Sequence, residues 1–205
     1  NWAKQADSFE SMGLSQELVC GIKGIGFTEP SIIQELSIAP IIQGHHVIAQ
    51  AQDGLGKTGA LGIGILGAID ATQPITQAII LSPTRETTFN THLLLVNLGH
   101  LIPGLRVEGF HSSQNRLYEA DVAHSQPHIV VCTPERCLTL VNSGDLRLDS
   151  LKIICLDDAG QLLAENSFGQ IQDILSHLSP DSTQHLFFSA EYPQSVLRLT
   201  EQFMD

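Results

Sequence analysis

Residues 51–58 read Ala-Gln-Asp-Gly-Leu-Gly-Lys-Thr and continue the apolar stretch Val47–Ala51. Small residues between a strand and a helix let backbone N–H groups surround a phosphate, and the helix N-terminus adds positive potential. In such a loop Lys57 reaches the outer phosphates, and the Thr58 hydroxyl holds Mg²⁺. We therefore predict a nucleotide phosphate loop whose binding residues are Gln52, Gly54, Gly56, Lys57 and Thr58.

Two residues of this loop depart from the usual pattern. Ala51 stands where the first glycine is expected, and Asp53 places a carboxylate inside the loop. A carboxylate there should weaken phosphate binding unless it points outward, because like charges repel. The alternative interpretation is a glycine-rich turn that contains an incidental lysine.

Short apolar runs alternate with longer helical patterns along the chain, which favours an α/β fold. Continuous apolar runs are typical of parallel strands buried on both faces. We expect strands at Val47–Ala51, Ala78–Leu81, Arg106–Gly109, Ile129–Cys132, Ile153–Leu156 and His185–Phe188. We expect helices at Thr58–Ala71, Glu86–Leu98, Asn115–His124, Pro134–Asn142, Gln170–Leu178 and Pro193–Phe203. The result is a parallel sheet with helices on both faces, in one domain over residues 1–205: a helical region at 9–45, broken at Gly26 and Pro30, precedes a core at 46–205. The glycines in Leu61–Ile69 are expected to permit close helix–sheet packing.

Composition limits the possible partners. Ten basic residues face 22 acidic ones, for a net charge of −12, so a broad basic surface for nucleic acid is excluded. The four cysteines show no zinc spacing, which indicates reduced thiols in an intracellular protein. We expect the protein to be cytoplasmic rather than nuclear. We expect no targeting or membrane segment and no metal site at His45-His46.

A second acidic motif follows a predicted strand: residues 153–160 read Ile-Ile-Cys-Leu-Asp-Asp-Ala-Gly. P-loop NTPases place a carboxylate near Mg²⁺ at the end of an apolar strand. Asp157 is then the metal-side residue, and Asp158 could orient a water. The alternative is a helix N-cap, where aspartate is also favoured.

The order of these motifs resembles the N-terminal RecA-like domain of DEAD-box ATP-dependent RNA helicases, closest to the translation initiation factor 4A subfamily. Residues 26–34, Gly-Phe-Thr-Glu-Pro-Ser-Ile-Ile-Gln, are similar to the adenine-reading Q motif. The resemblance implies that Gln34 binds the adenine edge and that Phe9 or Phe27 packs near the base. It also implies ATP and Mg²⁺ as cofactors, with the metal held through Thr58 and Asp157, and Lys57, Asp157 and Asp158 as catalytic residues.

The same resemblance implies contacts to RNA and to a second domain. Residues 83–86 and 133–136 match segments that contact single-stranded RNA backbone, which assigns Thr84, Arg85, Thr133 and Arg136 to RNA. Ser189 and Glu191 lie where the family has its Ser-Ala-Thr coupling motif.

Several chemical positions depart from the family pattern. The water-orienting glutamate is Asp158, one methylene shorter; the last aspartate of the family motif is Gly160, and the coupling threonine is Glu191. Because the last two positions touch in the family, we hypothesise that the acid has moved across that contact. The family's Gly-Gly turn is His111-Ser112, and Glu135 adds a carboxylate where RNA phosphate is expected. We therefore expect weak RNA binding by this domain.

Two functions remain open. The first is the ATP-binding domain of an RNA helicase, which needs a second RecA-like domain for hydrolysis and unwinding and should be inactive alone. The second is a catalytically impaired pseudo-helicase that acts as a nucleotide-binding scaffold or regulatory partner. In both cases we expect a monomer that binds ATP or ADP. We also expect it to bind a scaffold protein of the translation or RNA-processing machinery.

Overall fold

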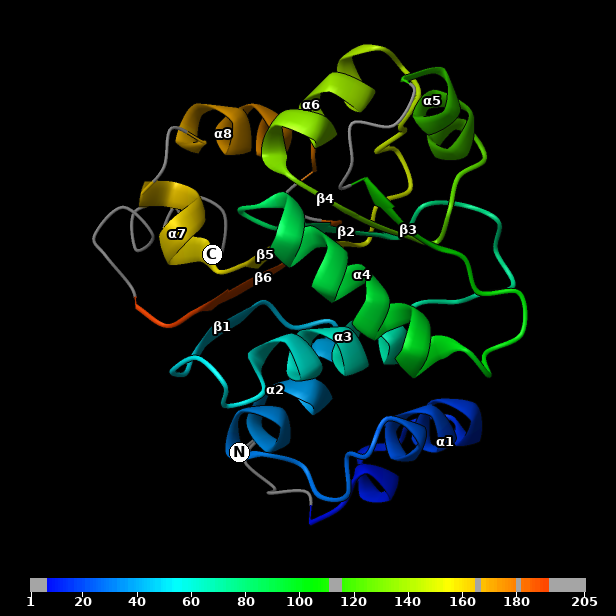
Figure 1. The fold of residues 1–205 in the computed structure, drawn as a ribbon, viewed down its shortest axis with the longest axis vertical. Coiled ribbons are helices and arrows are strands. Elements are labelled where there is room, and N and C mark those ends of the chain that lie inside the picture. Colours follow the sequence, from blue (N-terminus) through cyan, green and yellow to red (C-terminus); the bar gives the residue numbers. More distant parts are fainter. Residues whose placement is uncertain (1–6, 111–115, 165–166, 180–181, 192–205) are drawn as a thin grey trace.

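A computed structural model of the chain describes residues 7–110, 116–164, 167–179 and 182–191. Six parallel strands form one sheet in the order β1-β6-β5-β2-β4-β3 (Figure 1). The strands are β1 (Val47–Gln50), β2 (Ala78–Leu81), β3 (Val107–Phe110), β4 (Ile129–Cys132), β5 (Ile153–Asp157) and β6 (Gln184–Ser189). Each predicted strand is found, with ends that differ by at most one residue.

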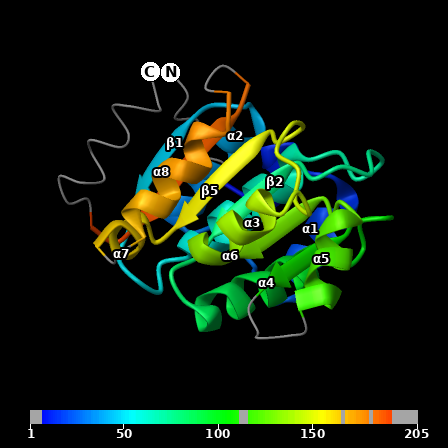
Figure 2. The same ribbon diagram turned by 90° about the horizontal axis from the view of Figure 1, so that it is seen from above.

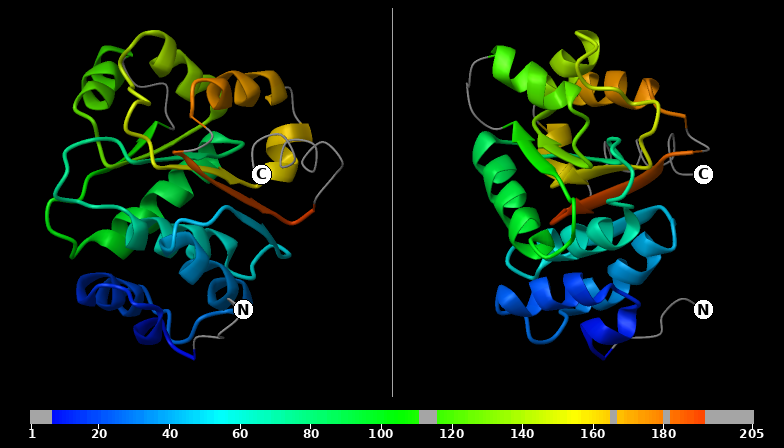
Figure 3. Two further views of the ribbon diagram at one scale, coloured as in Figure 1. Left: turned by 180° about the vertical axis from the view of Figure 1, so that it is seen from behind. Right: turned by 90° about the vertical axis from the view of Figure 1, so that its right-hand side faces the viewer.

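Helices cover both faces of this sheet (Figures 1 and 3). A short 3₁₀-helix, η1 (Phe9–Met12), precedes α1 (Gln16–Gly24), α2 (Ile32–Ile42), α3 (Lys57–Ala68) and α4 (Arg85–Gly99). The later helices are α5 (Arg116–His124), α6 (Pro134–Asn142), α7 (Ala159–Ala164) and α8 (Phe168–Ser176). The predicted α/β class is confirmed, as are the breaks at Gly26 and Pro30. The predicted helix Pro193–Phe203 lies outside the described residues, and α7 was not predicted.

The strand period divides the core into two layers, because successive side chains of a strand point to opposite faces. On β2, Ala78 and Ile80 pack with helices α1 to α4, whereas Ile79 and Leu81 pack with residues of α5 to α8. Seen from above, α6 and α8 lie in front of the sheet, α8 on one side of the β5 arrow and α6 on the other (Figure 2). None of the described helices is long and apolar enough to span a membrane.

The glycines of α3 serve helix–helix contacts, which corrects the expectation of helix–sheet packing. A Cβ on Gly64 would lie 3.0 Å from both Cβ and Cγ2 of Ile41 on α2. A Cβ on Gly62 would lie 3.3 Å from Leu98 of α4. Missing side chains therefore let α3 approach its neighbours and bring the start of α3 close to α2.

We predict that Gly64→Ala destabilises the domain. The added methyl group overpacks against Ile41, at a cost of about 1–3 kcal/mol, which outweighs a gain in helix propensity of about 1 kcal/mol. Gly169→Ala in α8 is the matched control, since a Cβ there meets nothing within 4 Å. Chemical denaturation should show a lower midpoint for Gly64→Ala and an equal or higher one for Gly169→Ala. Equal midpoints for Gly64→Ala and the parent would contradict this packing argument.

Candidate functional site

The predicted site residues follow strands that are neighbours in the sheet. Because all six strands are parallel, their carboxyl ends lie at one edge, where ligands bind in open α/β sheets. Along that edge, the loop at 51–58 follows β1, Ser189 and Glu191 lie at the end of β6, and Asp157 and Asp158 lie at the end of β5. Next along the edge, Thr84 and Arg85 follow β2, and Thr133 and Arg136 follow β4. The predicted phosphate loop and the predicted RNA segments thus lie at opposite ends of one row, with the acidic pair between them.

The loop at 51–58 has the backbone of an anion-binding turn. Gly54 and Gly56 have φ of 81° and 93°, a region that side chains other than glycine rarely adopt. Gly56 is the N-cap of α3, and no side chain caps this helix. The first N–H groups of α3 are therefore left for an anionic ligand.

Lys57 already has an anionic partner. Its Nζ donates to the Ala51 carbonyl at 2.6 Å and to Asp53 Oδ1 at 2.8 Å. The Lys57 side chain is 9% exposed, whereas that of Asp53 is 87% exposed. The hydrogen bond from Lys57, followed by its charge, lowers the pKa of Asp53. The Asp53 carboxylate therefore turns back onto the lysine rather than outward.

Gln34 holds the phosphate loop against α2. Its Oε1 accepts from the backbone N–H of Ser31 at 2.9 Å, and its Nε2 donates to the Gly56 carbonyl at 3.3 Å. A Cβ on Gly59 would lie 2.7 Å from Gln34 Nε2 and 3.0 Å from the Phe27 ring. Gln34 and Phe27 thus meet at the first turn of α3.

The other two residues predicted for the nucleotide lie differently. Phe9 is 1% exposed and belongs to the hydrophobic core, so it has no free ring face to offer a base. Gln52 is exposed at the start of the loop, and its carbonyl accepts from the N–H of Leu55 at 3.4 Å.

A pocket of about 510 Å³ brings together Asp53, Lys57, Thr58, Asp157 and Asp158. Asp157 is 7% exposed, and its Oδ2 accepts from the Thr91 hydroxyl at 2.9 Å. Desolvation by burial raises the pKa of Asp157 to about 6, against the lowering effect of the Thr91 hydrogen bond. Thr91, in the second turn of α4, fixes the orientation of this carboxylate; sequence reasoning missed it, and no local motif marks the position.

Asp158 behaves as a helix cap in this structure. Its carbonyl accepts from the N–H of Leu162 at 3.0 Å, and its Oδ1 accepts from the N–H of Gln161 at 3.3 Å. Its φ of 66° is unusual for a residue with a side chain. The N-cap interpretation of this aspartate is therefore supported by geometry, although the residue also lines the pocket.

Gly160 lies close to the backbone of Glu191, and the Glu191 residue itself is exposed. The N–H groups of Gly160 and Glu191 both donate to Ser189 Oγ, at 3.0 and 3.3 Å. A Cβ on Gly160 would lie 2.7 Å from Ser189 Oγ and 3.0 Å from the Glu191 carbonyl oxygen. Position 160 therefore has no room for a side chain while Ser189 and Glu191 stay in place.

The predicted RNA residues stand at two helix N-termini. Thr84 is the N-cap of α4 and accepts from the N–H of Thr87 at 3.1 Å, and Arg85 beside it is exposed. Thr133 is the N-cap of α6, and Arg136 is half-buried in the first turn of this helix. Glu135 is exposed next to Arg136, so its carboxylate lies at the same N-terminus of α6 as the arginine proposed to contact RNA.

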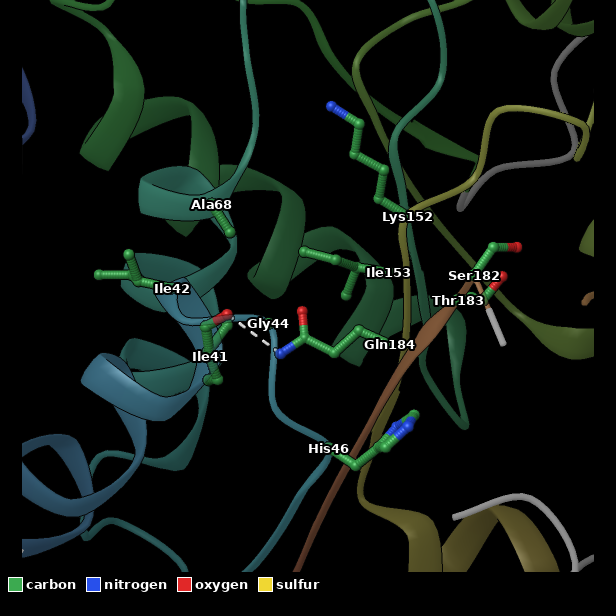
Figure 4. A pocket seen from close by; sticks show the side chains of 10 residues that line it. All are labelled: Ile41, Ile42, Gly44, His46, Ala68, Lys152, Ile153, Ser182, Thr183 and Gln184. Carbon is green, nitrogen blue, oxygen red and sulfur yellow. Dashed lines mark hydrogen bonds between the residues drawn. The ribbon is translucent and has the colours of Figure 1, made fainter. Parts of the chain in front are cut away.

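A second pocket, of about 250 Å³, opens at the opposite edge of the sheet (Figure 4). Its polar side chains include Gln184, whose Nε2 donates to the carbonyls of Ile41 and His45. His46 Nδ1 accepts from the N–H of His185 at 2.9 Å. These groups tie the end of α2 to the starts of β1 and β6, so sequence features such as His45-His46 have a structural role.

The fold and the loop define a RecA-like domain of the P-loop class, and comparison with known proteins identifies the family. The family model described as DEAD/DEAH box helicase matches residues 31–199. The ATP-dependent RNA helicase eIF4A of Neurospora crassa is 38% identical over 204 residues, covering 100% of this chain and 51% of the relative. That of Mycosarcoma maydis is 36% identical, covering 100% of this chain and 49% of the relative. The chain belongs to the DEAD/DEAH box helicase family, as the motifs predicted, and spans about half the length of these curated relatives.

Solved structures agree with this assignment. A DEAD box protein from the hyperthermophile Methanococcus jannaschii superposes with a TM-score of 0.90 at 29% identity, covering 97% of this chain and 54% of that chain. S. cerevisiae Dbp5 bound to RNA and ADP BeF3 gives a TM-score of 0.83 at 26% identity, with coverage of 98% and 50%.

We predict that Asp157→Asn stabilises the ligand-free domain at neutral pH. The folded chain holds the Asp157 proton up to about pH 6, whereas the unfolded chain releases it near the ordinary aspartate pKa of 3.8. Stability therefore falls as the pH rises from about 4 to 6, and the full cost is present at pH 7. A pKa raised by about two pH units corresponds to about 3 kcal/mol, so we expect a gain of about 1–3 kcal/mol at pH 7.5 that shrinks toward pH 4.5.

Denaturation at several pH values measures this effect. Asp173→Asn, on an exposed position of α8, is the control that changes the net charge equally. A loss of stability in Asp157→Asn at pH 7.5 would show that the hydrogen bond from Thr91 outweighs the desolvation of the carboxylate.

Proposed function

We propose that this chain is the nucleotide-binding RecA-like domain of a DEAD-box ATP-dependent RNA helicase. It binds Mg-ATP and single-stranded RNA backbone, and it needs a second RecA-like domain for hydrolysis and unwinding. The observation that supports the proposal is the row of strand ends, along which lie the loop at 51–58, the pair Asp157 and Asp158, and the N-termini of α4 and α6. This chain spans about half of each eIF4A relative, which supports the proposal that activity requires a second domain.

The residues present fit a magnesium nucleotide. Mg²⁺ prefers oxygen ligands, and the Thr58 hydroxyl and the Asp157 carboxylate line the same pocket. The bound ion would neutralise charge on the phosphates. Lys57 would bind an outer phosphate, the start of α3 would bind the inner ones, and Gln34 with Phe27 would receive the adenine.

RNA would bind at the other end of the row. Arg85 and Arg136 supply positive charge at the N-termini of α4 and α6, which follow the neighbouring strands β2 and β4. Glu135 opposes that charge, and the chain carries a net charge of −12. We therefore propose that this domain alone holds RNA weakly and depends on a second domain for affinity.

A second candidate, the impaired pseudo-helicase, is favoured by the state of Asp158. The shortened carboxylate caps α7 through Oδ1 and Gln161, so a water would have to share a carboxylate that is already held at the helix. A group displaced by about 1 Å from its productive position can lower a rate by about 100-fold. On this second proposal the chain binds nucleotide and acts as a scaffold or regulator.

We propose a monomeric, cytoplasmic protein that works with a protein partner of the translation or RNA-processing machinery. The relative Dbp5 of S. cerevisiae has been solved bound to Gle1 and IP6, which supports a protein partner for a domain of this fold.

Calorimetric titration of Mg-ADP tests the nucleotide site directly. The chain should bind ADP, and Lys57→Ala should lose at least about tenfold in affinity because a charge-assisted hydrogen bond to phosphate is removed. Equal affinity in the two proteins would exclude the phosphate loop as the binding site, and no binding in either would exclude nucleotide binding.

Phosphate release by the natural full-length protein separates the two candidates. RNA-stimulated turnover that Lys57→Ala abolishes supports the active helicase. Intact ADP binding without turnover supports the impaired one.

A further inference from the structure

We propose that Asp53 is an internal competitor for nucleotide phosphate: its carboxylate occupies the place on Lys57 that an outer phosphate would take. This inference rests on the proposed nucleotide site and adds a specificity to it. Asp53 should lower the affinity for adenosine di- and triphosphates and leave the affinity for the monophosphate almost unchanged.

Lys57 already donates two hydrogen bonds within the chain. An ammonium group has three donor hydrogens. Two of them are directed to the Ala51 carbonyl and to Asp53 Oδ1, at 2.6 and 2.8 Å. Because the side chain is 9% exposed, few other directions are open to it. A phosphate oxygen that binds Lys57 must therefore share the ammonium with Asp53 or take its place.

The Asp53 side chain is highly exposed to water. At 87% exposure the carboxylate can turn into water without disturbing the packing of its neighbours. Among the described residues, the salt-bridge partner of Asp53 is Lys57. Because the Asp53 end of the pair is exposed to water, a phosphate can take its place on Lys57, and the carboxylate lowers affinity rather than abolishing binding.

The surrounding charge adds to the effect. The pocket that holds Lys57 is also lined by Asp157 and Asp158, so three carboxylates share one lysine. A displaced Asp53 stays in the loop and repels the incoming phosphate. Removing its charge eliminates both the competition for Lys57 and this repulsion.

The geometry also sets which ligands are affected. In a loop of this kind the lysine reaches the β- and γ-phosphates, whereas backbone N–H groups hold the inner ones. A monophosphate places no group on Lys57. The penalty from Asp53 should therefore depend on the presence of an outer phosphate.

Calorimetric titrations of Mg-ADP and of AMP into four proteins test the proposal. The proteins are the parent chain, Asp53→Asn, Asp53→Ser and the control Asp173→Asn, which removes one negative charge from α8. We expect both Asp53 variants to bind ADP about tenfold more tightly than the parent. Their affinity for AMP should change less than twofold, and Asp173→Asn should match the parent for both ligands. Thermal unfolding of each variant confirms that it is folded.

The outcomes separate this proposal from the function on which it rests. ADP binding that is the same in the parent and both folded Asp53 variants overturns the competitor and leaves the nucleotide site intact. An equal gain for AMP also overturns it, since the effect would then be general to the loop. ADP binding by the variants alone supports the competitor in its strongest form. No binding by any protein overturns the nucleotide site, and the competitor with it.

Discussion

The parallel hydrogen-bonding of six short strands is the constraint on which the rest of this molecule depends. Each described site residue that follows a strand gains its neighbours because that strand is paired in register, as with Asp157 beside Phe188. Apolar burial on both faces holds the ladder, and helices on each side exclude water from it. The strand order then decides which loops meet, and it places the acidic pair between the phosphate loop and the helix ends proposed for RNA.

The sequence could predict the strands because each is a continuous apolar run, and it could predict that their ends share one edge. The order of the strands could not be predicted from the sequence, because β1 pairs with β6 across some 140 residues of chain and no local pattern encodes that pairing. Helix α7 was missed because its six residues carry no helical period of their own. The partners of the glycines in α3 could not be predicted either, because a sequence does not say which neighbour a helix approaches.

The residue types of the site could be predicted, but their contacts could not. The ion pair of Asp53 with Lys57, the cap made by Asp158 and the hydrogen bond from Thr91 all depend on side-chain directions. Motif reasoning treats each position as a role in the bound state. The ligand-free chain instead satisfies its charged groups internally, because a buried lysine or carboxylate without a partner is costly.

These hydrogen bonds within the chain bear on both candidate functions. Lys57 is held by Asp53, Asp157 by Thr91, and Asp158 by the start of α7, so each group proposed to act on a nucleotide first has to leave, or share, a partner within the chain. The Asp53 carboxylate is exposed and can leave Lys57 when a phosphate replaces it, whereas Thr91 and Asp157 are buried together. Nucleotide binding as proposed needs Asp53 to give way on Lys57, while the proposed water orientation needs Asp158 to share a carboxylate that caps α7. The contacts of Asp53 and Asp158, two positions at which this chain departs from its family, thus bear on both candidate functions.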